Sequence, residues 1–198
     1  NIRYFDILTG KTDREEEALL VRANNRTYRS RGIQTRAEYR FNLNEFFFDL
    51  EFGLRYHADE EDRFQWDDSY SMKNKKMVLF MEGIHGTNAN RVTSANALAG
   101  YLLAKLRYDA WTVTAGLRYE DVDLLKKDYT KEDLARSGKV RIETPNHARV
   151  LIPGVGLHYQ LMPAASVFFG IHKGFAPPSA ELYQKPESSV NMELGTRV

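Results

Sequence analysis

The sequence predicts an all-β protein built from about seven antiparallel strands. The first observation behind this prediction is a strict alternation of apolar and polar residues in the segment Trp111–Glu120. The same alternation returns in the segments 27–41, 46–57, 97–108, 147–159, 165–173 and 190–198. The second observation is that the connections between these segments are alternately short and long, as in an up-and-down antiparallel sheet.

The chain begins with a short apolar stretch at residues 2–8, followed by Gly10 and the charged run KTDREEE. This pattern predicts the end of a strand and a long polar loop up to residue 25. Short turns are then expected at Asn42–Asn44, at Asp109 with Ala110, and at Leu161–Pro163. Each of these turns joins two alternating segments into a hairpin.

Three polar segments predict long loops, at about 58–93, 121–146 and 175–188. Within the first of them, Phe64–Trp66 and Met77–Met81 are apolar enough to pair as a small hairpin. The acidic run Asp59–Asp62 is interpreted as a solvated loop tip, because it lacks the ligand spacing of a calcium loop. One rim of the sheet therefore carries tight turns and the other carries large loops.

The composition bounds the class of protein. The chain has 198 residues, a formal net charge of +1 and no cysteine, so disulfides and thiolate metal sites are excluded. No apolar run reaches the roughly 20 residues of a membrane helix, and the start of the chain shows no signal-peptide pattern. The mean hydropathy of −0.52 suits a soluble protein. It equally suits a membrane β-barrel, in which only alternate residues touch lipid.

Two architectures place one apolar face on every strand. In a soluble sandwich or lipocalin-like barrel that face points inward, whereas in an outer-membrane barrel it points at lipid. Aromatic residues bound the apolar faces, and Trp111 to Tyr119 spans roughly 20 Å of membrane normal in a tilted strand. Short turns that oppose long loops are also typical of outer-membrane barrels. These observations favour a partial antiparallel up-and-down transmembrane β-barrel, with the soluble sheet as the alternative.

Three runs also resemble a known family. They are WTVTAGLRYEDV from Trp111, LIPGVGLHYQLMPAASVFFGIHKGFAPPSAEL from Leu151, and KPESSVNMELGTRV from Lys185. In this order they are similar to the barrel of TonB-dependent outer-membrane receptors, particularly the ferric-citrate-receptor-like branch, and the likeness is firmest over residues 94–198. The resemblance implies that residues 1–198 are part of one transmembrane barrel domain of about 22 strands. The plug domain and its TonB-contacting box are absent from the chain, so we expect an internal fragment.

The function that this resemblance implies is energised uptake of an iron chelate, ferric citrate or another siderophore, across the outer membrane of a Gram-negative bacterium. The expected partners are the chelate, outer-membrane lipid, and the TonB complex through the missing plug. A passive porin-like barrel and a soluble β-sheet binding protein remain alternatives. No cofactor is expected beyond the transported ferric chelate.

Other chemistries find little support in the residues. No Gly-x-Ser-x-Gly or comparable nucleophile motif occurs, so we do not expect an enzyme. The five histidines have no paired spacing, which predicts no metal site. The basic run at Lys73, Lys75 and Lys76 lacks interleaved aromatics, so no nucleic-acid partner is expected.

The candidate ligand-binding residues follow from the charge of the expected cargo. A citrate chelate is anionic, and guanidinium groups and amides suit carboxylates. By position and resemblance, Arg91 at the end of the first long loop and Gln184 in the proline-bounded third loop are candidates. Arg63 and His57 are further candidates at the same rim.

Overall fold

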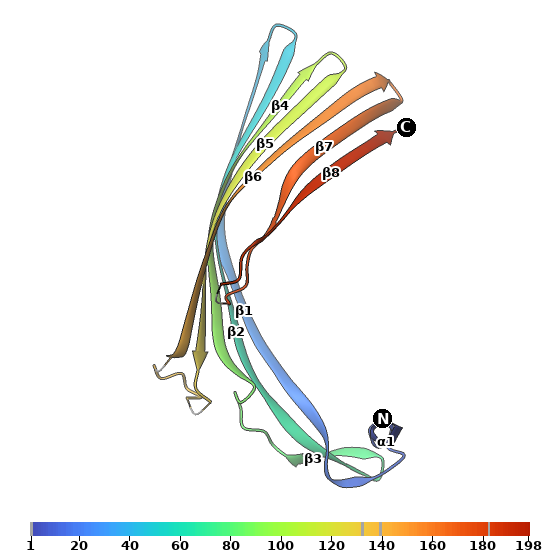
Figure 1. Cartoon of the computed structure of the whole chain (residues 1–198), viewed down its shortest axis with the longest axis vertical. Coiled ribbons are helices and arrows are strands. Elements are labelled where there is room, and N and C mark those ends of the chain that lie inside the picture. The colour runs from blue at the N-terminus through green and yellow to red at the C-terminus, as the bar shows by residue number, and fades with distance from the viewer. Residues whose placement is uncertain (1, 132, 139, 182) are drawn as a thin grey trace. The chain divides into compact units, whose positions relative to one another are not determined.

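The computed structural model describes every residue except 1, 132, 139 and 182 (Figure 1). A short helix precedes a series of long strands. The elements are α1 (Ile2–Leu8), β1 (Arg14–Leu43), β2 (Phe46–Lys73), β3 (Lys76–Met81), β4 (Ala89–Tyr108), β5 (Trp111–Tyr129), β6 (Val140–Met162), β7 (Ala165–Ala176) and β8 (Glu187–Arg197).

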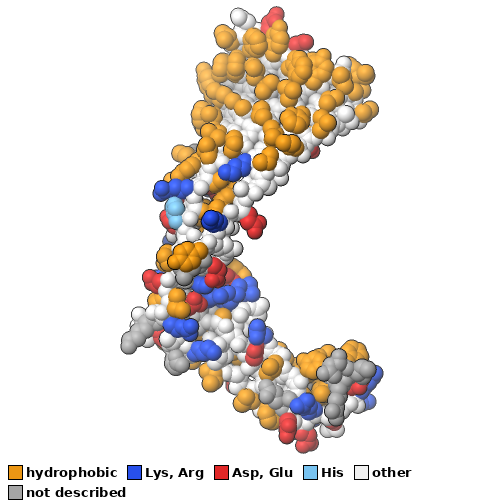
Figure 2. All heavy atoms as spheres, viewed as in Figure 1, with side chains coloured by type: hydrophobic (Ala, Val, Ile, Leu, Met, Phe, Trp, Pro, Cys, Tyr) orange, Lys and Arg blue, Asp and Glu red, His pale blue; other side chains and the backbone are white. Residues whose placement is uncertain are grey.

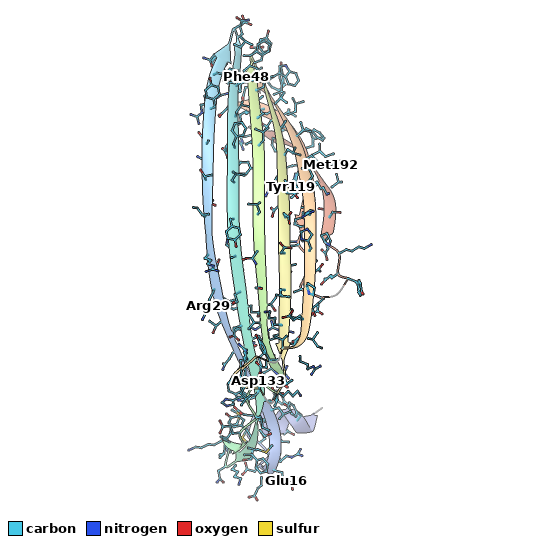
Figure 3. The ribbon with its side chains drawn as sticks, turned by 90° about the vertical axis from the view of Figure 1, so that its left-hand side faces the viewer. Glu16, Arg29, Phe48, Tyr119, Asp133 and Met192 are labelled. Carbon is cyan, nitrogen blue, oxygen red and sulfur yellow. The ribbon has the colours of Figure 1, made fainter. Side chains whose placement is uncertain are left out.

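The strands form one sheet in the order β1-β2-β4-β5-β6-β7-β8, with β3 paired to β2 beside this path. Figure 3 shows the strands lying side by side, with Phe48 on β2, Tyr119 on β5 and Met192 on β8. Apart from β3, strands that follow one another in the sequence are neighbours in the sheet, so the predicted all-β, up-and-down fold is confirmed. In the described residues the main path has the seven predicted strands, and β3 is an eighth.

The chain divides into two compact units. The first comprises residues 1–29, 60–93 and 126–143, and the second comprises residues 30–59, 94–125 and 144–198. Among the described residues, no helix has the length and hydrophobicity needed to cross a membrane.

In the second unit the apolar face of the strands is the more exposed one. Along β5, Trp111, Val113, Ala115, Leu117 and Tyr119 are exposed, whereas the residues that alternate with them are half-buried. Phe52 on β2 is 47% exposed. Figure 2 shows hydrophobic side chains gathered over the strand segments next to the tight turns. A soluble sandwich would bury this face, so the alternative of a soluble sheet loses its support.

Aromatic pairs across neighbouring strands mark the tight-turn end of the apolar face. The rings of Phe41 and Phe48 stack at 4.7 Å, and those of Phe46 and Tyr108 stack at 4.6 Å. Two of the turns place a non-glycine residue at positive φ, Asn44 at 53° and Asp109 at 47°. Asn and Asp tolerate this conformation better than other residues, so these positions suit a tight hairpin turn.

The opposite face of the same segments carries the predicted mixture of charges, and we call it the charged face. Nη1 of Arg36 on β1 lies 3.8 Å from Oε2 of Glu51 on β2, and Nε of Arg40 lies 3.5 Å from Oδ2 of Asp49. The Tyr101 hydroxyl on β4 donates to Glu51 at 2.6 Å. Cross-strand pairs of this kind stabilise the register of a sheet.

In the first unit a small core holds the N-terminal helix to the sheet. Ile7 of α1 packs with Leu19 of β1 and Met72 of β2, and all three are buried. The β2–β3 hairpin turns at Asn74 and Lys75, which both have positive φ, as a type I′ turn requires.

The observed elements correct several expectations. Residues 2–8 form a helix instead of a strand end, and β1 begins at Arg14, inside the expected first loop. The loop expected at 58–93 instead contains the end of β2, all of β3 and the start of β4, and β3 pairs with Ser69–Lys73 rather than with Phe64–Trp66. The loop expected at 121–146 contains the end of β5 and the start of β6. Strand segments that are polar on both faces lack the apolar alternation on which the prediction relied.

Candidate functional site

The four predicted ligand-binding residues fall in different parts of the structure. Arg63 lies on β2 and Arg91 on β4, and both belong to the first compact unit. His57 on β2 and Gln184 in the β7–β8 connection belong to the second unit.

A guanidinium clamp fixes how β2 and β4 lie beside each other in the first unit. Arg136, in the connection between β5 and β6, donates to both carboxylate oxygens of Asp62 at 2.5 and 2.7 Å. It also donates to Oδ1 of Asn90 at 2.7 Å. Asp62 and Asn90 therefore point to the same side of two adjacent strands. Because successive side chains alternate, Arg63 and Arg91 point to the other side of these two strands.

The carboxylate of Glu61 collects donors on the side that Arg63 occupies. Arg63 donates to Oε1 of Glu61 through Nε at 3.2 Å and Nη2 at 2.9 Å. The Tyr28 hydroxyl donates to the same oxygen at 3.3 Å, and Nη1 of Arg26 lies 3.4 Å from it. Two guanidinium groups and a phenol thus share one carboxylate.

Arg91 adds a third guanidinium group to this part of the sheet. Its Nε is buried and has no hydrogen-bond partner among the described residues. Arg26, Arg63 and Arg91 come from three adjacent strands and carry three positive charges against the single negative charge of Glu61. We call these four residues with Tyr28 the arginine cluster. Its excess of two positive charges and its free donor suit a ligand that carries several carboxylates.

A separate ion pair lies farther along the same two strands. Arg22 donates to Asp67 through Nε at 2.8 Å and Nη2 at 3.0 Å. The hydrogen bond from Arg22 holds the pKa of the Asp67 carboxyl below its ordinary value of 3.8, and the carboxylate in turn raises the pKa of Arg22. This pair orders the strands next to the arginine cluster.

The Arg22–Asp67 pair predicts a pH dependence. Since the pKa of Asp67 is lowered on folding, the pair stabilises the fold above pH about 3.8 and is lost as the pH falls through the lowered value. We expect a carboxyl titration of Asp67, followed by carbon NMR and assigned with Asp67→Asn, to have its midpoint below 3.8. Arg22→Gln should return the midpoint toward 3.8. An unchanged midpoint in that variant would contradict the assigned cause.

His57 and Gln184 have partners of their own. His57 Nε2 lies 2.8 Å from Oδ1 of Asp59 and 3.2 Å from the Ser30 hydroxyl. The Gln184 side chain is exposed and accepts a hydrogen bond from Ser179, and the Gln184 carbonyl accepts one from Asn146 at 3.1 Å. The structure places Arg63 and Arg91 on the same side of adjacent strands, whereas His57 and Gln184 have separate local contacts.

Sequence reasoning missed Arg26, Tyr28 and Glu61. Glu61 belongs to the acidic run interpreted as a loop tip, yet all four acids of that run lie on β2 and each faces a basic side chain. A usable signal was present, because charged and amide side chains recur at every second position in Arg22–Arg26 and in Glu61–Asp67. In a strand whose two faces both contact water, a period-two pattern of polar side chains indicates the strand, just as apolar alternation does elsewhere.

Residues 3–198 match the family model described as TonB dependent receptor-like, beta-barrel. The chain belongs to this receptor family. This match confirms, at the level of the family, the sequence resemblance to the TonB-dependent receptors. No protein among the curated sequences matches the chain. Relatives in the family are β-barrel proteins of the outer membrane of Gram-negative bacteria, and they are transporters rather than enzymes.

Two solved structures share the fold of this receptor chain. The unliganded ferric citrate transporter FecA is similar with a TM-score of 0.65 and 18% identity, over 89% of this chain and 26% of FecA. The siderophore receptor PiuA from Acinetobacter baumannii is similar with a TM-score of 0.64 and 13% identity, over 89% of this chain and 30% of PiuA. The chain therefore spans between a quarter and a third of each of these receptors.

Proposed function

We propose that this chain is part of the barrel of an outer-membrane receptor that takes up an anionic iron chelate, ferric citrate or another siderophore. The observation that carries the proposal is the arginine cluster, in which two guanidinium groups share the carboxylate of Glu61 and Arg91 of the adjacent strand adds a third positive charge. Family membership supports the transport of an iron chelate, and the charge excess supports an anionic one. In the proposed receptor the energy comes from the TonB complex, through the plug domain that the family resemblance implies.

The chemistry of the cluster suits carboxylates. A planar guanidinium group binds a carboxylate through two parallel hydrogen bonds, which favours citrate over a neutral cargo. Glu61 holds Arg26 and Arg63 in place until the chelate arrives, and Arg91 on the adjacent strand β4 adds a further positive charge. His57 and Gln184 remain proposed as further contacts of the chelate. The cargo iron arrives with its own ligands, so no resident cofactor is part of this proposal.

The alternative of a passive porin-like barrel differs in its need for energy. A passive barrel would conduct solutes without TonB and without a saturable site. The match to a TonB dependent receptor-like family supports the energised receptor over a passive barrel. The exposed apolar face of the strands supports lipid as the surrounding medium.

The proposal is tested by ferric citrate binding to the full-length receptor in detergent. We expect saturable binding, with Arg63→Gln and Arg91→Gln each weakening it roughly 10- to 100-fold, because each removes a charge-assisted hydrogen bond worth about 1.5–3 kcal/mol. Arg29→Gln is the matched control, since Arg29 is exposed and pairs with Glu60 away from the cluster.

Two outcomes count against the proposal in different ways. If neither ferric citrate nor any other anionic siderophore binds, the function is wrong. If a chelate binds equally well to the wild-type protein and to both cluster variants, the function stands and the assigned site is wrong.

A further inference from the structure

A second group of ionisable side chains lies on the apolar side of β5 and β6. Alternate residues of a strand share a face. Asp121 and Asp123 therefore lie on the same face of β5 as Tyr119, and His147 and Arg149 lie on the same face of β6 as Leu151. These four charged or ionisable residues belong to the second compact unit and stand just beyond the end of the exposed apolar face. The function proposed above makes no use of them.

The contacts leave one oxygen of Asp121 aimed at an imidazole nitrogen. Oδ2 of Asp121 accepts a hydrogen bond from Nε of Arg149 at 2.8 Å and one from the Tyr119 hydroxyl at 3.3 Å. Oδ1 of Asp121 faces Nε2 of His147 at 3.5 Å. On the other side of the ring, Nδ1 of His147 lies 2.7 Å from Oδ1 of Asp123. The ligand atoms of the two aspartates and the histidine all lie within 4.8 Å of one another.

We propose that Oδ1 of Asp121 and Nε2 of His147 bind a divalent transition-metal ion such as Zn²⁺, with Asp123 orienting the imidazole and water completing the ligand set. When Nδ1–H of His147 donates to Asp123, the lone pair on Nε2 points toward Oδ1 of Asp121. This is the carboxylate–histidine–metal arrangement that orients imidazole ligands in zinc sites. Two ligand atoms of a tetrahedral zinc ion stand roughly 3.3 Å apart, close to the 3.5 Å found between Nε2 and Oδ1.

The charge balance also favours a cation. Two aspartates against Arg149 leave one net negative charge when His147 is neutral, and this charge attracts a divalent cation. Arg149 does not compete for the proposed ligand atom, because it binds Oδ2 and leaves Oδ1 open. An imidazole in the ligand set selects zinc and its neighbours over magnesium and calcium, which prefer oxygen ligands alone.

The site opens onto a cavity of about 660 Å³ that leaves room for water ligands. Asp123, His147 and Tyr183 line this cavity together with Ser94 and Asn96. Asn146, the residue before His147, donates through Nδ2 to the carbonyls of Ser179, Glu181 and Gln184. These hydrogen bonds tie the segment that carries His147 to the connection between β7 and β8.

This inference does not depend on the proposed cargo. The test uses the full-length receptor in detergent, free of iron chelate, titrated with Co²⁺ and then displaced with Zn²⁺. We expect saturable visible absorption from one bound Co²⁺ per receptor, lost in His147→Ala. Asp123→Asn should weaken binding roughly 10- to 100-fold, since it removes the group that orients the imidazole. His172→Ala is the matched control, because His172 contacts Asn191 on β8 and lies outside this cavity.

The result that overturns the proposal is binding of equal strength in the wild-type protein, His147→Ala and Asp123→Asn, or no saturable binding in the wild-type protein. Each variant is first checked for barrel folding by its heat-modifiable migration on gels. Asp123→Asn keeps the size and the exposed setting of the side chain, so it reports on metal affinity even if His147→Ala folds poorly.

Discussion

Ala115→Arg is expected to destabilise the receptor in a bilayer by about 2–4 kcal/mol. Ala115 stands halfway between Trp111 and Tyr119 on the exposed apolar face of β5, which corresponds to the middle of the expected lipid band. An arginine on the lipid face of a barrel costs about 2–4 kcal/mol at the membrane midplane. The substitution removes only a methyl group, so the loss of packing is small. Folding into lipid vesicles, followed by heat-modifiable gel migration and by denaturant titration, measures the effect.

The neighbouring residue provides the control. Thr114 is half-buried and belongs to the opposite face of β5. Along this strand, the half-buried side chains of that face alternate with the exposed apolar ones. Thr114→Arg should fold with a free energy within about 1 kcal/mol of the wild-type value, because the opposite face of a barrel strand accepts charge. If both variants insert equally well, or if Thr114→Arg is the more harmful, the apolar face does not meet lipid.

Arg136→Ala is expected to release the connection between β5 and β6. The Arg136 side chain is 19% exposed and donates three hydrogen bonds, two to Asp62 and one to the buried Asn90. It also lies over the ring of Phe64 at 5.6 Å. Loss of these charge-assisted bonds should destabilise the segment by about 2 kcal/mol and speed hydrogen exchange of its amides roughly 30-fold.

Two further substitutions separate the contributions. Arg136→Lys keeps the charge but loses the bidentate contact with Asp62, so exchange rates should fall between those of the wild-type protein and Arg136→Ala. Arg29→Ala removes an exposed ion pair in which Nη1 of Arg29 lies 3.5 Å from Oε1 of Glu60. This substitution should leave the exchange rates of amides in the β5–β6 connection unchanged. Equal exchange in Arg136→Ala and the wild-type protein would mean that the clamp does not hold the connection.

The strand segments with an apolar face were predictable from the sequence, and their polar extensions were not. Trp111–Tyr119 alternates because one of its faces is apolar and exposed, and the structure confirms both the strand and its face. Beyond Tyr119 the strand continues to Tyr129, but neither face needs hydrophobic side chains there. The sequence then reads as a loop, although backbone pairing carries the strand onward.

Part of the arginine cluster could also be anticipated. Arg63 and Arg91 are candidates from the charge of the expected cargo, and the structure places them on adjacent strands. Arg26 and Glu61 required knowledge of the β1–β2 register, because the pair joins residues 35 positions apart in the chain. Register depends on pairing between distant segments, which local alternation does not specify.

The sequence by itself determined the all-β fold, the tight turns and the apolar face, because each follows from local alternation and turn chemistry. Only the tertiary structure decided which charged side chains meet, including the arginines around Glu61 and the aspartates around His147. These contacts join different strands, so they exist only once the strands have paired in register.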